Sequence, residues 1–285
     1  MLSTLDHLVI AVRDLDVATR TYAALLGRAP SWRGEHPGAG TANTLFRLDR
    51  TYVELLAPVA SGALADPLRA HLDDAGEGPY AIAFGTDDAA ACAAALRARG
   101  LAPSDPIEAT GRDLTSGAER RWHLVMLSRK DTRGVRLFAI EHRSPPEGLP
   151  LVAPAQPAAA VHGVDHVVIM TTDAERACAL YRDQLGLRLA FDRTFEGRGV
   201  RLMFFRIGGV TVELAAPLAG PTGSDDRFWG VSWRVTDLDA AHARLVAAGF
   251  DVSEVRPGHK SGTRVCTVRR ETHGVATLVL EPATA

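Results

Sequence analysis

Two polar residue types stand in otherwise apolar segments, and each occurs twice. His7 lies in the run DHLVIAV and Glu54 in the run YVELLAP, while His166 and Glu213 hold the equivalent places later in the chain. A carboxylate in an apolar strand needs a compensating partner, and metal, arginine and histidine are the plausible ones. Imidazole nitrogen with carboxylate oxygen suits a divalent Zn, Fe, Ni, Mn or Co ion. These four residues are candidate metal ligands, with structural hydrogen bonding at a strand start as the alternative for each His.

The second pair belongs to an internal copy of the first part of the chain. Residues 1–58 reappear at 160–217, so that the Leu-Gly pair 26–27 matches 185–186. A repeat of this length is far above the roughly 20–50 residues of stacked arrays and indicates duplicated domains. The chain of 285 residues also suits about two domains. We predict domains at 1–144 and 161–285, joined by a Pro/Ala-rich linker at 145–160.

Each copy divides again into two similar halves. A β-rich run, an Asp-led helical stretch that ends at Gly, and further short strands follow one another in each half. The expected strands are 5–12, 30–33, 43–48, 51–57, 80–86, 121–128, 135–141, 164–171 and 229–235, with further strands up to 217 and 281. The expected helices are 16–26 and 89–99, and two that end at Gly186 and Gly249. The sequence predicts an α+β fold of four βαβββ modules, paired into two domains with curved mixed sheets.

Two short turns fix the neighbours of each Glu. The segments at 48–51 and 207–210 are typical of two-residue hairpins, and such turns place Leu45 and Phe204 opposite the two Glu residues. Arg47 and Arg206 then lie on the Glu face as diagonal neighbours. They either form structural ion pairs there or anchor an anionic group of a substrate, for which arginine is well suited.

Aromatic residues supply further candidates for substrate binding. Tyr52 falls beside Glu54 on one strand face, and Trp122 and Trp229 could line a pocket for a planar ligand, with core packing as the alternative. His123 is either a general base or a structural residue.

The runs at 6–12 and 52–58, with their copies, resemble the vicinal oxygen chelate superfamily, which includes glyoxalase I, methylmalonyl-CoA epimerase, extradiol dioxygenases and bleomycin-resistance proteins. The stretch 36–43 and the pair Arg121-Trp122 are similar to its glyoxalase-like branch. This resemblance implies a metal site with one ligand from the first and one from the last strand of both modules in a domain. His7 with Glu54, and His166 with Glu213, match half of that set.

The second module of each copy departs from the family pattern. Ala81 and Gly230 stand where the family often has His. Phe138 and Leu278 stand where it has the final Glu or Gln. A three-residue shift in register would instead bring in Glu141 and Glu281, as a third ligand or a general base. Without that shift each copy keeps only half of the family's metal ligands.

Two functions follow from these alternatives. The first is a glyoxalase-like enzyme, a metal-dependent lyase or isomerase acting on a small anionic, oxygen-chelating substrate. The second is a metal-free binding protein of the drug-sequestering kind. An extradiol-type dioxygenase is less favoured, because it expects His at Gly230. If one copy alone is active, the polar loop 191–200 favours the C-terminal one.

The composition of the chain limits the classes of partner that it can bind. A net charge of −2 and a pI near 6.6 argue against nucleic acid, and no glycine pattern predicts a nucleotide cofactor. Three scattered cysteines indicate a reducing compartment, and neither a leader peptide nor an apolar run of about 18 residues is evident. We expect a cytoplasmic protein with a small-molecule ligand and no membrane partner, either a monomer with an internal pseudo-dimer or a homodimer.

Overall fold

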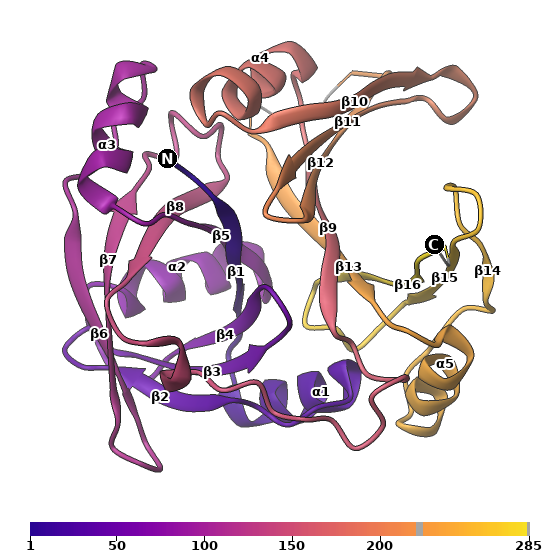
Figure 1. Ribbon diagram of the computed structural model, residues 1–285, viewed down its shortest axis with the longest axis horizontal. Coiled ribbons are helices and arrows are strands. Elements are labelled where there is room, and N and C mark those ends of the chain that lie inside the picture. Colours follow the sequence, from indigo (N-terminus) through magenta and orange to yellow (C-terminus); the bar gives the residue numbers. More distant parts are fainter. Residues whose placement is uncertain (221–224, 284–285) are drawn as a thin grey trace.

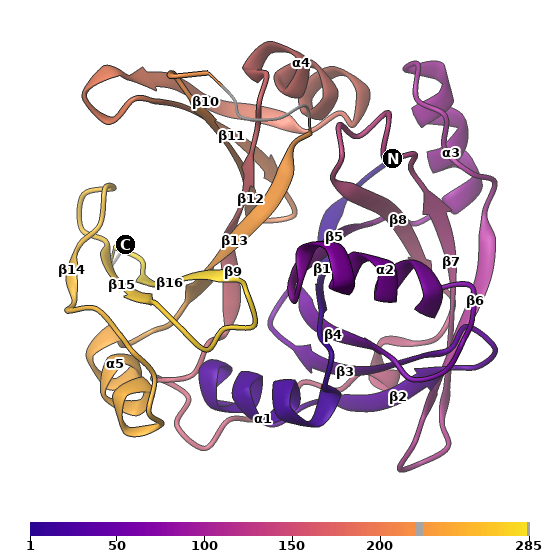
Figure 2. The ribbon, with the colours of Figure 1, turned by 180° about the vertical axis from the view of Figure 1, so that it is seen from behind.

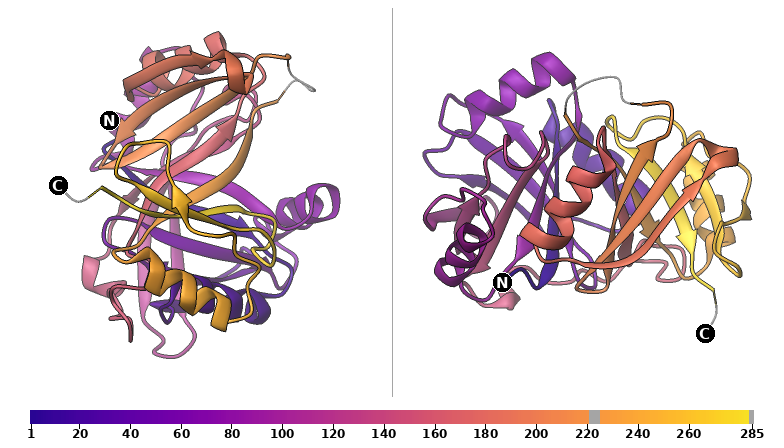
Figure 3. Two further views of the ribbon diagram at one scale, coloured as in Figure 1. Left: turned by 90° about the vertical axis from the view of Figure 1, so that its right-hand side faces the viewer. Right: turned by 90° about the horizontal axis from the view of Figure 1, so that it is seen from above.

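The computed structural model describes residues 1–220 and 225–283, which form two curved mixed sheets side by side (Figures 1 and 3). The first sheet closes into a barrel in the order β1-β4-β3-β2-β6-β7-β8-β5. Its strands are β1 (Thr4–Ala11), β2 (Trp32–His36), β3 (Thr41–Arg47), β4 (Tyr52–Pro58), β5 (Gly78–Gly85), β6 (Ile107–Asp113), β7 (Glu119–Met126) and β8 (Arg136–His142). We call this unit the barrel.

The second sheet stays open, in the order β10-β11-β12-β9-β13-β16-β15-β14. Its strands are β9 (Gly163–Met170), β10 (Arg188–Phe195), β11 (Val200–Ile207), β12 (Val210–Pro217), β13 (Arg227–Arg234), β14 (Arg256–Pro257), β15 (Arg264–Val268) and β16 (Ala276–Glu281). We call this unit the open sheet. The α+β class, the four modules and the curved mixed sheets are those that the sequence predicts.

Helices cover the outer faces of both sheets and one end of the barrel. The barrel unit carries α1 (Leu15–Leu26), α2 (Ala65–Ala75), α3 (Ala89–Ala98) and the 3-10 turn η1 (Pro146–Gly148). The open-sheet unit carries α4 (Ala174–Ala179), the π-helical turn η2 (Leu180–Gln184), the 3-10 turn η3 (Glu196–Arg198) and α5 (Leu238–Ala247). Asp14, Asp88, Asp173 and Asp237 each cap a helix N-terminus by accepting a hydrogen bond from a backbone N–H.

Two elements of the barrel escape the sequence prediction and decide its shape. Strand β6 pairs with β2 and closes the ring, with Gly34 opposite Asp113. A Cβ on Gly34 would lie 2.5 Å from the carbonyl oxygen of Arg112, so this closure requires glycine. In the open sheet the corresponding strand is the two-residue β14, too short to reach β10.

The second unpredicted element, α2, lies across one end of the barrel (Figure 2). Leu68 and Leu72 of this helix pack against Val9, Leu56 and Ala81. At another place on the barrel, Leu149 from the linker packs against Trp32, Leu45 and Tyr52. The barrel interior is therefore covered by helix and linker, whereas no helix among the described residues covers the concave face of the open sheet in this way.

Buried polar contacts join the two units. The Arg133 guanidinium holds the fully buried Asp226 carboxylate through Nε at 2.8 Å and Nη2 at 3.1 Å, and Thr171 Oγ1 donates to the same carboxylate at 2.8 Å. Arg244 of α5 donates to the Leu25 carbonyl at 3.0 Å, near the C-terminus of α1. Within the described ranges, no helix is long and apolar enough to cross a bilayer.

We expect Arg133→Ala to lower the free energy of unfolding by about 3–5 kcal/mol, because it leaves the Asp226 carboxylate buried without its cation. Arg69→Ala breaks an ion pair of exposed side chains with Asp66 and should cost about 0–1 kcal/mol. Urea denaturation of both variants checks this. Equal small losses would show that the interdomain pair contributes little.

Candidate functional site

Parallel pairing of the first and fourth strands brings His and Glu together in each unit. In the barrel, β1 pairs with β4 so that Val9 lies opposite Glu54, and in the open sheet β9 pairs with β12 so that Val168 lies opposite Glu213. The predicted hairpin pairs are also confirmed, with Leu45 opposite Glu54 and the equivalent pair in β11 and β12. Each His–Glu pair therefore shares one sheet face.

In the barrel, the His–Glu pair sits inside a buried polar network. His7 Nε2 lies 3.5 Å from Glu54 Oε2, and His7 Nδ1 lies 2.7 Å from Asp6 Oδ1. Asn43 Nδ2 donates to Glu54 Oε1 at 2.7 Å, and His36 Nε2 lies 3.8 Å from the same oxygen. Burial lowers the pKa of His36 despite the nearby Glu54 carboxylate.

Aromatic rings enclose this network. Tyr52 stacks on His7 with ring centroids 4.3 Å apart, and Phe138 meets the same imidazole edge-on at 5.5 Å. Trp122 approaches His36 at 5.9 Å, and the buried Arg120 guanidinium lies over the Tyr52 ring at 5.8 Å. Tyr52 and Trp122 thus lie around the buried His–Glu pair.

In the open sheet the equivalent His faces a different set of partners. His166 Nδ1 lies 2.8 Å from Asp165 Oδ2, and its Nε2 lies 2.9 Å from Ser232 Oγ and 3.7 Å from Glu213 Oε2. Arg234 Nε donates to Asp165 Oδ1 at 2.7 Å. The position opposite His7 in the barrel is Ala83, so the Ser contact is particular to the open sheet.

The two carboxyl groups beside His166 have opposite pKa shifts. Burial would raise the pKa of Asp165, but hydrogen bonds from His166 and Arg234 outweigh it and lower this pKa to about 2. Burial raises the pKa of Glu213, even with His166 and Arg198 nearby. Asp165 is therefore ionised at neutral pH, whereas burial favours the protonated form of Glu213.

An apolar wall continues the same concave face. Val168, Leu202 and Ala215 are buried there, and they pack with the partly buried side chains of Met170, Phe191, Phe195, Val200 and Phe204. The Phe191 and Phe204 rings stack 4.8 Å apart. Alternation along the strands places this wall beside His166 and Glu213, where an apolar ligand body could lie.

The second modules supply no further ligands. Ala81 pairs with Arg136, so Phe138 takes the place that corresponds to Glu54. Gly230 pairs with Ala276 in the same way, which puts Leu278 in the place of Glu213. The three-residue shift therefore does not occur. Throughout the described residues, no three His, Cys, Asp or Glu side chains converge so as to hold a metal ion.

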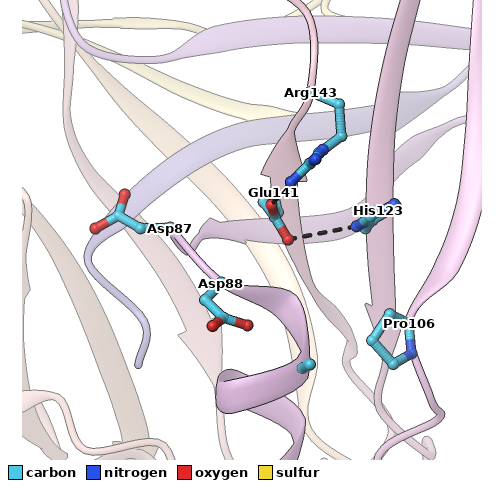
Figure 4. Close-up of a pocket in the computed structure, with 7 residues that line it drawn as sticks. Asp87, Asp88, Pro106, His123, Glu141 and Arg143 are labelled. Carbon is cyan, nitrogen blue, oxygen red and sulfur yellow. Dashed lines mark hydrogen bonds and ion pairs between the residues drawn. The ribbon is translucent and has the colours of Figure 1, made fainter.

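Glu141 and Glu281 lie instead at helix N-termini. Glu141 Oε2 accepts from the Ala89 backbone N–H at 2.9 Å at the start of α3, with His123 Nδ1 3.4 Å away (Figure 4). That backbone hydrogen bond lowers the pKa of Glu141, outweighing burial with help from Arg143 and His123. Glu281 Oε2 likewise accepts from the Leu238 N–H at 2.8 Å at the start of α5. Glu141 and Glu281 therefore cap helices and do not belong to the His–Glu pairs.

The hairpin arginines occupy the predicted places diagonal to each Glu on the same sheet face, because Arg47 lies opposite Tyr52 and Arg206 opposite Thr211. Among the described side chains, neither Arg47 nor Arg206 forms an ion pair with its Glu; Arg47 is half-buried, and Arg206 is exposed opposite Thr211. Trp229 lines a cleft between the barrel and the open sheet. Sequence reasoning missed Asp165 as the partner of His166, although an Asp precedes the His in both copies.

Comparison with known proteins agrees with this architecture. A family model described as "Glyoxalase-like domain" matches residues 5–185, and one described as "Glyoxalase/Bleomycin resistance protein/Dioxygenase superfamily" matches 165–267. No curated protein sequence matches the chain.

Several solved structures are similar in fold. A mutant 4-hydroxymandelate synthase from Streptomyces coelicolor is 14% identical, with a TM-score of 0.72 over 100% of this chain and 94% of that one. A hypothetical protein from Staphylococcus aureus is 11% identical, with a TM-score of 0.64 over 96% and 98%. BphC, a halotolerant catechol dioxygenase, is 13% identical, with a TM-score of 0.62 over 99% and 87%. At these identities the likeness concerns the fold.

We expect Glu281→Ala to lower the free energy of unfolding by about 1 kcal/mol, because the Leu238 N–H loses its acceptor. Ligand binding in the open sheet should not change. Thermal melting and a binding titration separate the two effects, with Glu254→Ala on the surface as control. A loss of binding without a loss of stability would assign Glu281 to the site.

The raised pKa of Glu213 makes stability fall as pH rises. The folded state binds more protons than the unfolded state above the ordinary value of 4.5, so this contribution is fully present below that pH and is lost as pH rises through the folded pKa. Glu213→Gln removes the titration. We expect wild type to lose stability relative to this variant from about pH 4 upward in urea denaturation. Parallel stability curves for the two proteins would contradict the shift.

Proposed function

Because this chain belongs to the glyoxalase-like domain family, we propose that it is an enzyme of the lyase or isomerase type that moves a proton on a small substrate bound in the open sheet. The arrangement of His166 carries the proposal. Its Nδ1 is hydrogen-bonded to the ionised carboxylate of Asp165, and its Nε2 faces Ser232 and Glu213. An imidazole oriented in this way is suited to general-base catalysis.

The residues do not fit the divalent metal that the family resemblance implies. His166 and Glu213 could supply two ligands, but Gly230 and Leu278 have no donor atom in their side chains. We therefore assign no step to Zn, Fe, Ni, Mn or Co, and derive the chemistry from the side chains alone.

The proton transfer follows from the two carboxyl groups. Asp165 accepts a hydrogen bond from the Nδ1–H group of His166, which leaves the lone pair on Nε2, so Asp165 is a positioning residue. Nε2 takes a proton from a carbon next to a substrate carbonyl. In its protonated form, which burial favours, Glu213 donates a hydrogen bond to the carbonyl oxygen as negative charge develops. Return of the proton from His166 to a different atom completes an isomerisation.

The residues around His166 and Glu213 support one class of substrate. The rings of Phe191 and Phe204 suit an apolar or aromatic body. Arg198, whose guanidinium lies over the Phe195 ring at 5.5 Å, is close enough to Glu213 to influence its ionisation. A carboxylate on the substrate could pair with this guanidinium. We therefore propose an aromatic or branched 2-oxo acid, which is small and anionic, as the type of substrate.

A metal-free binding protein is the second candidate, favoured by the aromatic wall and by the missing donors of the second module. Both candidates require ligand binding in the open sheet. They differ in whether a carbon-bound proton exchanges with solvent.

We expect the protein to accelerate deuterium exchange at the benzylic carbon of phenylpyruvate in D2O, followed by proton NMR. His166→Ala should reduce the catalysed rate about 100-fold or more, since general-base catalysis contributes roughly that factor. His7→Ala is the matched control, because it makes the same change in the covered barrel, and it should leave the rate unaltered.

Two results would overturn the enzyme proposal. Binding of phenylpyruvate without any exchange above the uncatalysed rate favours the binding protein. Elemental analysis of untagged protein that finds about one metal per chain, lost in His166→Ala, favours metal chemistry instead.

Ser232→Ala, which reproduces the Ala found in the barrel, should lower the rate less than His166→Ala.

A further inference from the structure

A cleft of about 830 Å³ lies between the barrel and the open sheet, away from both His–Glu pairs. Its walls come from α2, the start of β5, the turn between β7 and β8, and the start of β13. These elements meet where the two units lie side by side in Figures 1 and 2. The cleft therefore has contributions from both units.

Three basic side chains cluster on the barrel side of this cleft. Arg136 lies over the Tyr80 ring at 4.5 Å, and His71 meets the same ring at 4.9 Å. Arg129 is close enough to act electrostatically on both other groups, and its Nε donates to the Gly134 carbonyl at 3.0 Å. Among the described residues, neither Arg129 nor Arg136 forms an ion pair, although both line a partly enclosed space.

Two of the acidic side chains that line the cleft already have basic partners other than Arg129 and Arg136. Asp226 is held by Arg133 at 2.8 Å, and Glu77 accepts from His273 at 2.7 Å. Asp74 also lines the cleft and acts on His71, and Asp225 packs against Gly134 at the rim. Burial lowers the pKa of Arg136, and the nearby Arg129 adds to this effect. Arg129 and Arg136 are close enough to repel each other and have no ion-pair partner among the described residues, and this arrangement favours a bound anion.

The cleft also offers surfaces for a planar group. The Trp229 side chain lines its open-sheet wall and is 45% exposed, which is unusual for a large aromatic residue beside a cavity. Tyr80 presents a ring from the opposite wall. Arginine that lies over an aromatic face keeps its in-plane N–H donors free for an oxyanion.

We propose that this cleft binds a small planar organic anion. The carboxylate or phosphate group of the anion pairs with the guanidinium groups of Arg129 and Arg136. The ring of the anion packs between Tyr80 and Trp229. Such a ligand contacts the barrel and the open sheet at once, so its binding stabilises the pairing of the two units. The site is independent of the proton-transfer chemistry proposed at His166.

Titration calorimetry with benzoate and with phenyl phosphate tests the proposal on the full chain and distinguishes the two sources of the oxyanion. Benzamide, which has the ring without the charge, and inorganic phosphate, which has the charge without the ring, are the matched probes. We expect at least one aryl anion to bind about tenfold more tightly than benzamide. It should also raise the melting temperature of the protein.

Arg136→Gln should weaken that aryl anion about tenfold or more, and Arg136→Lys should restore part of the loss. Arg69→Gln, on α2 but outside the cleft, is the control and should bind as wild type does. Trp229→Ala should weaken the aryl anion and leave inorganic phosphate unaffected. Glu213→Gln should bind the anion normally, which separates this site from the open-sheet site.

The inference is overturned if neither aryl anion binds up to about 10 mM, or if benzamide binds as well as they do. Equal affinities in wild type and Arg136→Gln would also overturn it, provided that circular dichroism shows both proteins to be folded.

Discussion

Parallel pairing between the first and fourth strands of a module is the constraint on which this molecule's chemistry depends. It places an imidazole and a carboxylate, which are 47 positions apart in each copy, on one sheet face within 3.5–3.7 Å. An Asp one residue earlier then fixes each imidazole through Nδ1. Because hydrogen bonds between strands set this register, a shift of one residue would turn the His or the Glu to the opposite face.

The two copies use this shared geometry in different surroundings. In the barrel, the polar network is enclosed by ring closure, by α2 and by the linker, and Glu54 is stabilised by Asn43. In the open sheet, burial raises the pKa of Glu213 and outweighs the opposite effects of His166 and Arg198. The same pair of residue types therefore lies in a buried polar network in one unit, and in the other it is the pair to which we assign acid–base chemistry.

The junction between the units combines a buried charge pair with a cleft. Arg133 and Asp226 compensate each other inside it, and Arg244 satisfies a backbone carbonyl near the end of α1. Beside these satisfied groups, Arg129 and Arg136 line the cleft, and neither has a carboxylate partner in the part of the chain that the structure describes. Duplication thus created a surface that neither copy has alone, and the residues on that surface differ from those at the two His–Glu pairs.

The duplication, the βαβββ modules, the helix caps and the hairpin registers could all be predicted from the sequence, because these features depend on local spacing and turn chemistry. The sequence also identified His166 and Glu213 as neighbours. The tertiary structure alone decided that β6 closes the barrel, that α2 covers its end, and that Ser232 faces His166. It also moved Glu141 and Glu281 to helix N-termini and Trp229 to the cleft. Those outcomes depend on pairing between segments distant in the chain, whose register and packing no local pattern specifies.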